Sequence, residues 1–243
     1  MQLFYAPDFS PPEHCLSEEE SKHCIRVLRL GEGDCIHITD GRGDLFCCRI
    51  VRADPKCCKV VAESAEREFE KLPCRLTMAV APTKNAERFE WFLEKATEVG
   101  VAEIVPLETA RSERRTFKPE RAEKVITAAM KQSLKAYRPR LHPLTPFETF
   151  VAEPFAGRRL IAHCGAALTP AGKGYLPSVL RAGEDVQILI GPEGDFSPEE
   201  TALALRCGFA EITLGPQRLR TETAAVAATV MVSVVNHTER HDY

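Results

Sequence analysis

The chain contains the stretch DVQILIGPEGDFSPEE at residues 185–200, followed by LALRCGFAEITLGPQRLRTETAA at 203–225. Within it, the apolar run Val186–Ile190 is typical of a strand buried in a parallel sheet. Gly191 and Gly194 follow directly, and glycine adopts the backbone angles that a sharp turn requires. The stretch therefore predicts a strand that ends in a tight polar loop.

A helix and a second strand-loop-helix unit are predicted after this loop. Ser197-Pro198-Glu199-Glu200 has the sequence of a capping box, with proline at the first helical position. Gly208 is the expected end of this helix. Ile212–Leu214 is the next predicted strand, and Thr221 is the expected N-cap of a helix that runs to about Asn236. This alternation predicts an α/β fold with a parallel sheet.

The two glycine-bearing loops are predicted to leave the ends of adjacent strands, at the edge where open α/β sheets bind ligands. Two ordinary turns between strand and helix would explain the capping box equally well. They would not explain Arg218, Arg220 and Glu222 gathered beside a turn, nor Glu193 between two glycines. These four side chains are therefore candidates for chemistry.

The motifs IGPEGDFS and LGPQRLRTETAA together resemble the paired signature of the RsmE family. RsmE proteins are SPOUT-superfamily methyltransferases that methylate N3 of a uridine in small-subunit (16S) ribosomal RNA. The family pattern usually has a second glycine where this chain has Asp195. The resemblance covers nearly the whole chain and is strongest over 75–140 and 185–228.

The resemblance implies S-adenosylmethionine held by loops tied in a trefoil knot. The implied cofactor contacts are Ile190, Gly191, Pro192, Glu193, Gly194, Leu214, Gly215, Leu219 and Thr223. Arg220 is the first candidate to stabilise the uridine anion, and Arg218 would share that role or bind phosphate. Glu193 is preferred over Glu222 as proton acceptor, because a glutamate near a helix start tends to stay ionised.

Composition is typical of a globular protein. The chain has 243 residues, of which 44% are hydrophobic and 28% charged, and its formal net charge is −3. No apolar run reaches the length of a membrane span, and the start MQLFYAPDFSPPEHC lacks the features of a secretory signal, so a cytoplasmic location is expected. The ten cysteines include no C-x-x-C pair. No metal site is therefore expected, and all ten are expected to be reduced.

A basic segment contrasts with the negative net charge. Residues 111–140 contain ten Lys or Arg and three Glu, a local charge of +7. Such a segment is typical either of a nucleic-acid contact or of a solvated helix surface. The region HCIRVLRLGEGD at 23–34 also resembles the RsmE amino-terminal region. The predicted RNA contacts are Arg26, Arg29, Lys84, Arg111, Arg114 and Arg115.

Two domains are expected. Short strands with frequent turns in 1–72 predict a small barrel, which the resemblance identifies as a PUA-like RNA-binding β-barrel. Residues 73–243 would form the SPOUT α/β methyltransferase domain with its parallel sheet and trefoil knot. The last helix is apolar nearly all round, which predicts burial in the core or against a second copy. SPOUT relatives dimerise through the knotted domain, so the resemblance implies a C2 homodimer.

The expected partner is 16S ribosomal RNA or the assembled small ribosomal subunit, with no membrane. One alternative function is a catalytically inactive, ribosome-associated RNA-binding protein. A weaker alternative is a nucleotide or phosphate binder that uses the helix beginning at Pro198. The absence of a Walker-type lysine after Gly194 counts against this last alternative.

Overall fold

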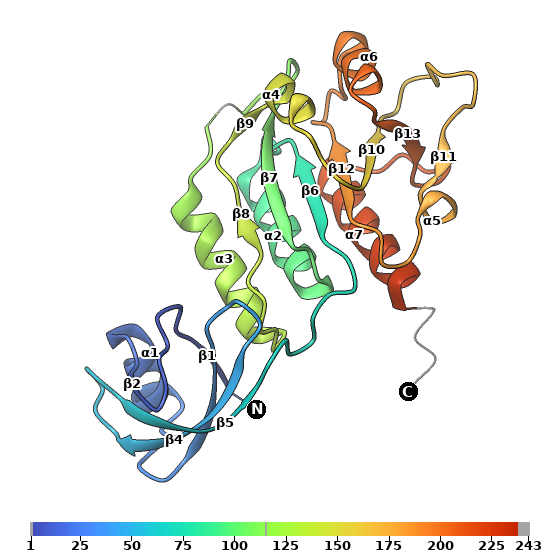
Figure 1. Ribbon diagram of the computed structural model, residues 1–243. Coiled ribbons are helices and arrows are strands. Elements are labelled where there is room, and N and C mark those ends of the chain that lie inside the picture. The colour runs from blue at the N-terminus through green and yellow to red at the C-terminus, as the bar shows by residue number, and fades with distance from the viewer. Residues whose placement is uncertain (1, 115, 238–243) are drawn as a thin grey trace. The chain divides into compact units, whose positions relative to one another are not determined.

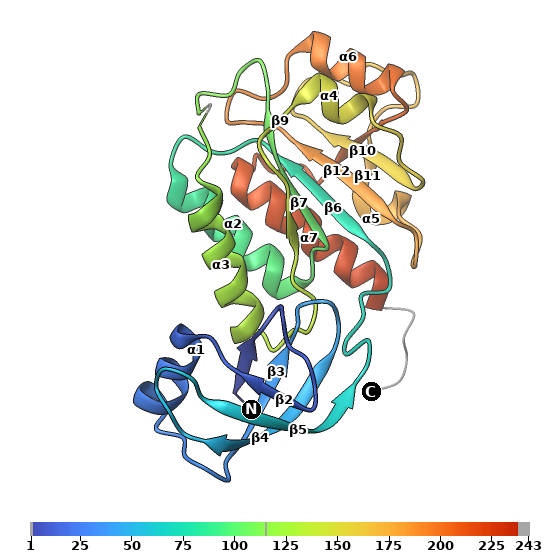
Figure 2. The same ribbon diagram turned by 60° about the vertical axis from the view of Figure 1, so that its left-hand side comes forward.

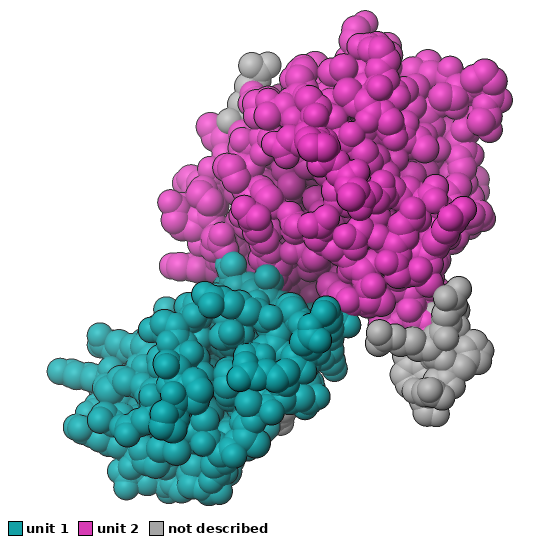
Figure 3. Space-filling model, in the orientation of Figure 1, with its two compact units in different colours: residues 1–71, 127–138 teal, residues 72–126, 139–243 magenta. Residues whose placement is uncertain are grey.

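The structure is a computed structural model and describes residues 2–114 and 116–237 (Figure 1). The chain divides into two compact units (Figure 3). Unit 1 comprises Met1–Lys71 and Thr127–Arg138, and unit 2 comprises Leu72–Ile126 and Pro139–Tyr243. The segment 127–138, which we expected in the second domain, therefore belongs to unit 1.

Unit 1 is a curled five-stranded sheet with a short helical segment. Its elements are β1 (Leu3–Tyr5), β2 (Glu13–Cys15), α1 (Glu18–Lys22), the π-helical η1 (His23–Val27), β3 (Cys35–Thr39), β4 (Leu45–Arg52) and β5 (Lys59–Glu66). The strand order is β1-β3-β4-β5-β2, and only the β1–β3 pair is parallel. Ile36 and Ile38 alternate along β3 and are fully buried beside Phe4 and Cys48. The predicted small β-rich unit is confirmed.

Polar contacts attach the segment 127–138 to unit 1. The ammonium of Lys131 donates to both carboxylate oxygens of Glu20, at 2.6 and 2.8 Å. The hydroxyl of Thr39 donates to the carbonyl of Ala136 at 3.0 Å. Local sequence patterns could not predict these contacts, because Thr39 and Ala136 lie 97 residues apart along the chain.

One expectation about the cysteines is wrong. Cys15 and Cys57 form a disulfide, with their Cα atoms 5.5 Å apart. Cys15 pairs with Lys59 where the edge strand β2 meets β5, so the strand register brings Cys57 close to Cys15. The spacing of cysteines along the chain does not reveal such a non-local pair. The other eight cysteines are free.

Unit 2 is built on an eight-stranded parallel sheet within the described residues. Its elements are β6 (Leu76–Val80), α2 (Ala86–Val99), β7 (Glu103–Glu108), α3 (Pro119–Gln132), β8 (Arg140–Leu141), β9 (Thr145–Pro146), α4 (Phe147–Ala152), β10 (Arg158–Ala162), β11 (Gly174–Tyr175), α5 (Leu176–Val179), β12 (Val186–Ile190), α6 (Pro198–Arg206), β13 (Ala210–Thr213) and α7 (Thr221–His237). The division between the units falls inside α3.

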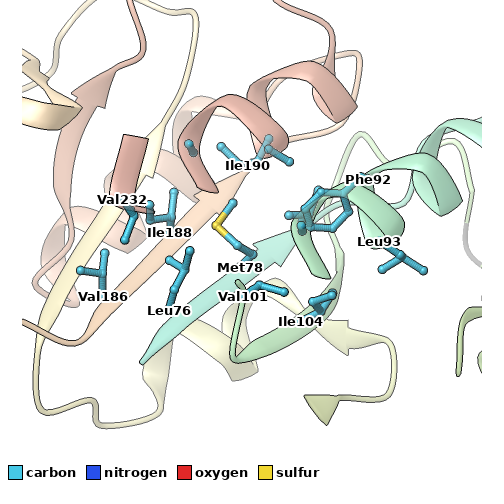
Figure 4. Packing of buried hydrophobic residues seen from close by; sticks show 14 of the residues in the cluster. Leu76, Met78, Phe92, Leu93, Val101, Ile104, Val186, Ile188, Ile190 and Val232 are labelled. Carbon is cyan, nitrogen blue, oxygen red and sulfur yellow. The ribbon is translucent and has the colours of Figure 1, made fainter. Parts of the chain in front are cut away.

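Helices cover both faces of this sheet. On one face, α2 and α7 pack together over side chains such as Met78 of β6 and Ile188 of β12 (Figures 2 and 4). On the other face, α4 and α6 cover Ala79 and Leu189, the neighbours of those residues along the same strands. Because successive side chains of a strand point to opposite faces, these apolar strands are buried on both sides. The predicted parallel α/β fold is confirmed.

The strand order corrects one expectation about the loops. The order runs β11-β13-β10-β12-β6-β7-β8, so β10 lies between β12 and β13. The two signature loops therefore leave strands that are not adjacent. A sequence shows which strands exist, but the order of parallel strands depends on crossovers that leave no local signal. The loop that follows β10 lies between the two signature loops in this order.

The helices of the signature stretch are close to prediction, with one difference. Ser197 and Glu200 form the expected capping box of α6. Gly208, with φ of +88°, follows the end of α6. Thr221 is not the N-cap of α7, because α7 begins at Thr221 and the Ala224 N–H bonds to the Arg220 carbonyl.

Candidate functional site

A cavity of about 880 Å³ opens at the carboxyl ends of β10, β12 and β13 in unit 2. Its volume is within the range of small-molecule and cofactor sites. Three loops form its wall, one from each strand. The lining residues are Ala162, His163, Cys164, Lys173, Ile190, Gly191, Pro192, Glu193, Gly194, Asp195, Ile212, Thr213, Leu214, Gly215, Pro216, Gln217, Arg218, Leu219, Arg220, Thr221 and Ala224.

The loop after β12 is held from two sides. The hydroxyl of Thr221 at the start of α7 donates to the Gly191 carbonyl at 3.1 Å. Arg111 Nη1 donates to the Gly194 carbonyl at 2.9 Å. A Cβ at Gly191 would lie 3.2 Å from the ring and the backbone nitrogen of Phe196. Glycine therefore allows the loop to fold tightly against Phe196 and present its backbone to the cavity.

The loop after β13 carries two arginines. Gly215 has φ of +126°, a conformation that favours glycine, and the Thr213 hydroxyl bridges its N–H and carbonyl at 3.2 and 3.1 Å. Arg218 and Arg220 are both exposed, and both line the cavity. Arg220 directly precedes α7, so the helix start fixes its backbone. The loop after β13 therefore brings two positively charged side chains to the cavity.

The two candidate carboxylates lie in different environments. Glu193 is exposed and lines the cavity, and its Oε1 accepts the Lys84 N–H at 3.1 Å. Glu222 is buried and is absent from the lining. Its Oε1 lies 3.8 Å from Arg88 Nε, and its Oε2 has no hydrogen-bond partner in the part of the chain that the structure describes. Of the two, Glu193 is the one placed to meet a ligand in the cavity.

The third wall, from the loop after β10, was not predicted. His163, Cys164 and Lys173 of this loop line the cavity. Asp195 Oδ2 accepts the Cys164 N–H at 2.9 Å and so joins this loop to the loop after β12. Asp195 has φ of +62°, a region that favours glycine and tolerates aspartate. The unusual aspartate within a glycine-bearing motif was the one signal in the sequence that could have pointed to this contact.

The structure gathers most of the predicted cofactor contacts around one cavity. Those in the lining are Ile190, Gly191, Pro192, Glu193, Gly194, Leu214, Gly215 and Leu219. Thr223 is exposed and outside the lining. The functional role of each residue stays a prediction.

The predicted RNA contacts of unit 1 are two exposed arginines. Arg26 belongs to η1, and Arg29 follows it with φ of +57°. Both side chains are exposed, and neither forms an ion pair with any residue in 2–114 or 116–237. Val27 between them is 66% exposed. This short surface therefore combines two cations with an apolar side chain.

The predicted RNA contacts of unit 2 have partners inside the protein. Lys84 Nζ lies 2.8 Å from Glu113 Oε2. Arg114 Nε donates to the carbonyl of Thr116 at 3.0 Å. Arg111 holds the loop after β12, as described above. Arg115 lies outside the described residues. The excess charge of 111–140 is thus partly used in internal contacts.

No group of three or more His, Cys, Asp or Glu could hold a metal ion within the described ranges. The helices in those same ranges include none that is long and apolar enough to cross a bilayer.

Family comparisons agree with this arrangement. Residues 70–233 match the model of an RNA methyltransferase domain, and residues 16–63 match that of an RNA methyltransferase PUA domain. The chain belongs to the RNA methyltransferase family. The particular branch is that of RsmE, since curated relatives along most of the chain carry the name "Ribosomal RNA small subunit methyltransferase E".

Individual relatives support the same family. The chain is 27% identical to the Bacillus subtilis protein of that name, over 99% of this chain and 95% of the relative. A probable rRNA-methyltransferase from Porphyromonas gingivalis is 45% identical, with a TM-score of 0.90, covering 98% of this chain and 99% of that one. A putative methyltransferase from Legionella pneumophila, solved with bound SAM, is 30% identical, with a TM-score of 0.83 and coverage of 96% and 97%.

Proposed function

We propose that this chain uses S-adenosylmethionine to methylate N3 of a uridine in the 16S RNA of the small ribosomal subunit. Membership of the RNA methyltransferase family and the RsmE relatives support the reaction and the RNA. The SAM-bound Legionella relative supports the cofactor. The observation that carries the proposal is the cavity, because both signature loops meet there.

The cavity suits this cofactor. Its volume of about 880 Å³ exceeds what a nucleoside with an amino-acid tail needs. The loop Ile190–Gly194 and the loop Leu214–Leu219 would contact the cofactor mainly through backbone groups. The close packing of Gly191 on Phe196 supports this, because a side chain at that position would disturb the loop.

The acceptor chemistry assigns roles to the charged residues in the wall. S-adenosylmethionine supplies an electrophilic methyl group. N3 of uridine carries a proton between two carbonyls, so its methylation requires loss of the proton and stabilisation of negative charge on the carbonyl oxygens. Arg220 would donate to that charge, with Arg218 assisting or binding phosphate. Glu193 would accept the proton, because it lines the cavity and Glu222 does not.

The remaining features of the proposal concern RNA and assembly. Residues 1–72 would act as a PUA-like RNA-binding domain through Arg26 and Arg29. Residues 73–243 would form the methyltransferase domain, although its segment 127–138 belongs to unit 1 of the fold. The cavity loops would form the trefoil knot of the SPOUT fold. The enzyme would act in the cytoplasm as a C2 homodimer, supported by the exposed Val230 and Val234 on α7.

Two measurements test the proposal. Calorimetric titration of the chain with S-adenosylmethionine should give saturable binding, and its absence would contradict the cofactor assignment. A strain that lacks the gene should lose one methylated uridine from its 16S RNA, and the purified chain should restore it. Cofactor binding or RNA binding without any methyl transfer would instead support the inactive RNA-binding alternative.

A further inference from the structure

A buried carboxylate beneath the third wall has an unusually complete set of donors. Glu211 of β13 is 4% exposed. Its Oε1 accepts from His163 Nε2 and from the Leu168 N–H, both at 2.8 Å. Its Oε2 accepts from the N–H and the hydroxyl of Thr169, at 2.8 and 2.7 Å. All of these donors belong to the loop 163–173.

The strand register explains why the loop meets this carboxylate. Ala162, the last residue of β10, pairs with Ile212 of β13, and Gly174, the first residue of β11, also pairs with Ile212. The chain thus leaves one side of β13 and rejoins it on the other side at the same level. The loop 163–173 must therefore cross a face of β13. The side chain of Glu211 binds this crossing loop, at a strand position that an apolar core residue would ordinarily occupy.

The same loop forms the third wall of the cavity. His163 forms a hydrogen bond with Glu211 and also lines the cavity, and its side chain is only 4% exposed. Lys173, at the far end of the loop, donates to the carbonyls of His163 and Gly165. The shape of the wall therefore depends on a loop that carries no regular secondary structure and folds around one acceptor.

The physical chemistry makes this acceptor hard to replace. A loop of this length would be expected to sample many backbone conformations. An ionised carboxylate satisfies four donors at once, and hydrogen bonds to a charged partner are stronger than neutral ones. An amide of the same shape has only one acceptor oxygen and would turn an N–H₂ group toward at least one donor.

We propose that Glu211 is a positioning residue for the cofactor, which acts by holding the loop 163–173 in the shape that forms the third wall. This inference rests on the proposed function of the cavity. Glu211 itself does not line the cavity, so its effect on a ligand passes through His163, Cys164 and Lys173. The cofactor would contact this wall equally in the bound state and in the transition state. The contact would therefore raise the affinity for the cofactor more than the turnover rate.

The test compares Glu211→Gln with a matched control in the full chain. Glu103→Gln removes the carboxylate of a second Glu–His pair in unit 2, in which Glu103 Oε2 lies 2.7 Å from His142 Nε2, away from the cavity lining. Calorimetry with S-adenosylmethionine should show a dissociation constant about ten-fold or more higher for Glu211→Gln and unchanged for Glu103→Gln. Turnover at saturating cofactor should stay within about three-fold of wild type.

A milder variant guards against loss of folding. Thr169→Val keeps the shape of the side chain and removes only the hydroxyl donor, and its dissociation constant should fall between those of wild type and Glu211→Gln. Amide hydrogen exchange at Leu168 and Thr169 should be slow in the ligand-free wild type and faster in both variants. This second readout does not depend on the identity of the ligand.

The outcomes separate this inference from the proposed function. If wild type does not bind S-adenosylmethionine, the proposed function fails, and hydrogen exchange still shows whether Glu211 holds the loop. If wild type binds and Glu211→Gln binds equally well, the inference is overturned. It is also overturned if Glu211→Gln lowers only the fraction of binding-competent protein, with the dissociation constant of that fraction unchanged, because this is the result of general destabilisation.

Discussion

Arg220 leaves the backbone at the residue directly before α7, where the helix start limits its freedom. If its guanidinium stabilises the uridine anion, Arg220→Ala should lower single-turnover methylation about 10²–10³-fold at saturating RNA and cofactor. Arg220→Lys should not restore the rate fully, because an ammonium lacks the planar fork. Cofactor affinity should be preserved.

Arg206→Ala is the matched control, because Arg206 is an exposed arginine on α6 outside the cavity lining. A rate for Arg220→Ala within a few-fold of wild type would transfer the role to Arg218. Simultaneous loss of cofactor binding would show that Arg220 holds the loop instead.

Two groups of predicted RNA-binding arginines should separate by function. The double variant Arg26→Ala, Arg29→Ala should weaken RNA binding, and it should reduce the slope of log affinity against log salt by about 1.5 to 2, because phosphate contacts release counterions. Its affinity for S-adenosylmethionine should not change. Arg111→Ala should lower the affinity for S-adenosylmethionine and leave RNA binding unchanged, because Arg111 donates to the Gly194 carbonyl beside the cavity. Fluorescence anisotropy with RNA and calorimetry with cofactor measure the two effects, and equal losses in both assays would contradict the division.

Glu211 also predicts a pH dependence of stability. Burial alone would raise the pKa of its carboxyl, but the hydrogen bonds from Leu168, Thr169 and His163 outweigh burial and lower the pKa from 4.5 to about 2. The folded chain therefore binds this proton less readily than the unfolded chain. The stabilisation is present in full above pH 4.5 and is lost as pH falls toward 2.

The lost stabilisation is on the order of 3 kcal/mol. Urea unfolding of wild type and Glu211→Gln should show a difference in unfolding free energy that shrinks steadily from pH 5 downward. A difference that stays constant over this range would mean that folding does not lower the pKa of the Glu211 carboxyl.

At the scale of elements, the signals that the sequence revealed were local ones. Val186–Ile190 forms a strand with the predicted bounds, and the predicted capping box at Ser197 begins α6. Both signals depend on residues only a few positions apart. The loop 163–173 could not be predicted as a wall, because its place follows from β10 lying between β12 and β13. Nothing local marked Glu211 either, which precedes the predicted strand Ile212–Leu214 and lies in β13.

The edge strand β2 provides a testable feature of unit 1. The disulfide from Cys15 to Cys57 closes a loop with a sequence separation of 42 residues. Loop closure of this size corresponds to a stabilisation of about 3–4 kcal/mol in the chain-entropy account. Cys57→Ser should therefore lower the unfolding free energy of the oxidised protein by up to about that amount and have little effect under reducing conditions.

Thiol titration in denaturant checks the pairing directly. Of the ten cysteines, eight should react without reductant and all ten after reduction. Ten reactive thiols in protein prepared under oxidising conditions would show that the bond does not form.

At the scale of the whole molecule, α7 predicts self-association. Seven of its residues are buried, including Ala228 and Val232 in the core, while Val230 and Val234 are 39% and 54% exposed. Exposed valines on a long apolar helix favour burial against a second copy. Sedimentation equilibrium at micromolar concentration should give a dimer, and Val230→Glu should shift it toward monomer. Val51→Glu, at a valine of unit 1 that is 44% exposed, should leave the dimer intact.

A monomeric wild type at micromolar concentration would remove the dimer from the proposed function. A dimer that Val230→Glu leaves unchanged would place the interface elsewhere on the chain.

The membership of 127–138 in unit 1 bears on how the chain is made. Ala136, which accepts the hydroxyl of Thr39, leaves the ribosome only after β6, α2 and β7 have emerged. The N-terminal unit therefore cannot finish folding as the first completed piece of a nascent chain, although domains generally fold in order of synthesis. A chain released after residue 72 would lack Lys131, the partner of Glu20. Expressed alone, that fragment would be a less stable protein than the same residues within the whole chain.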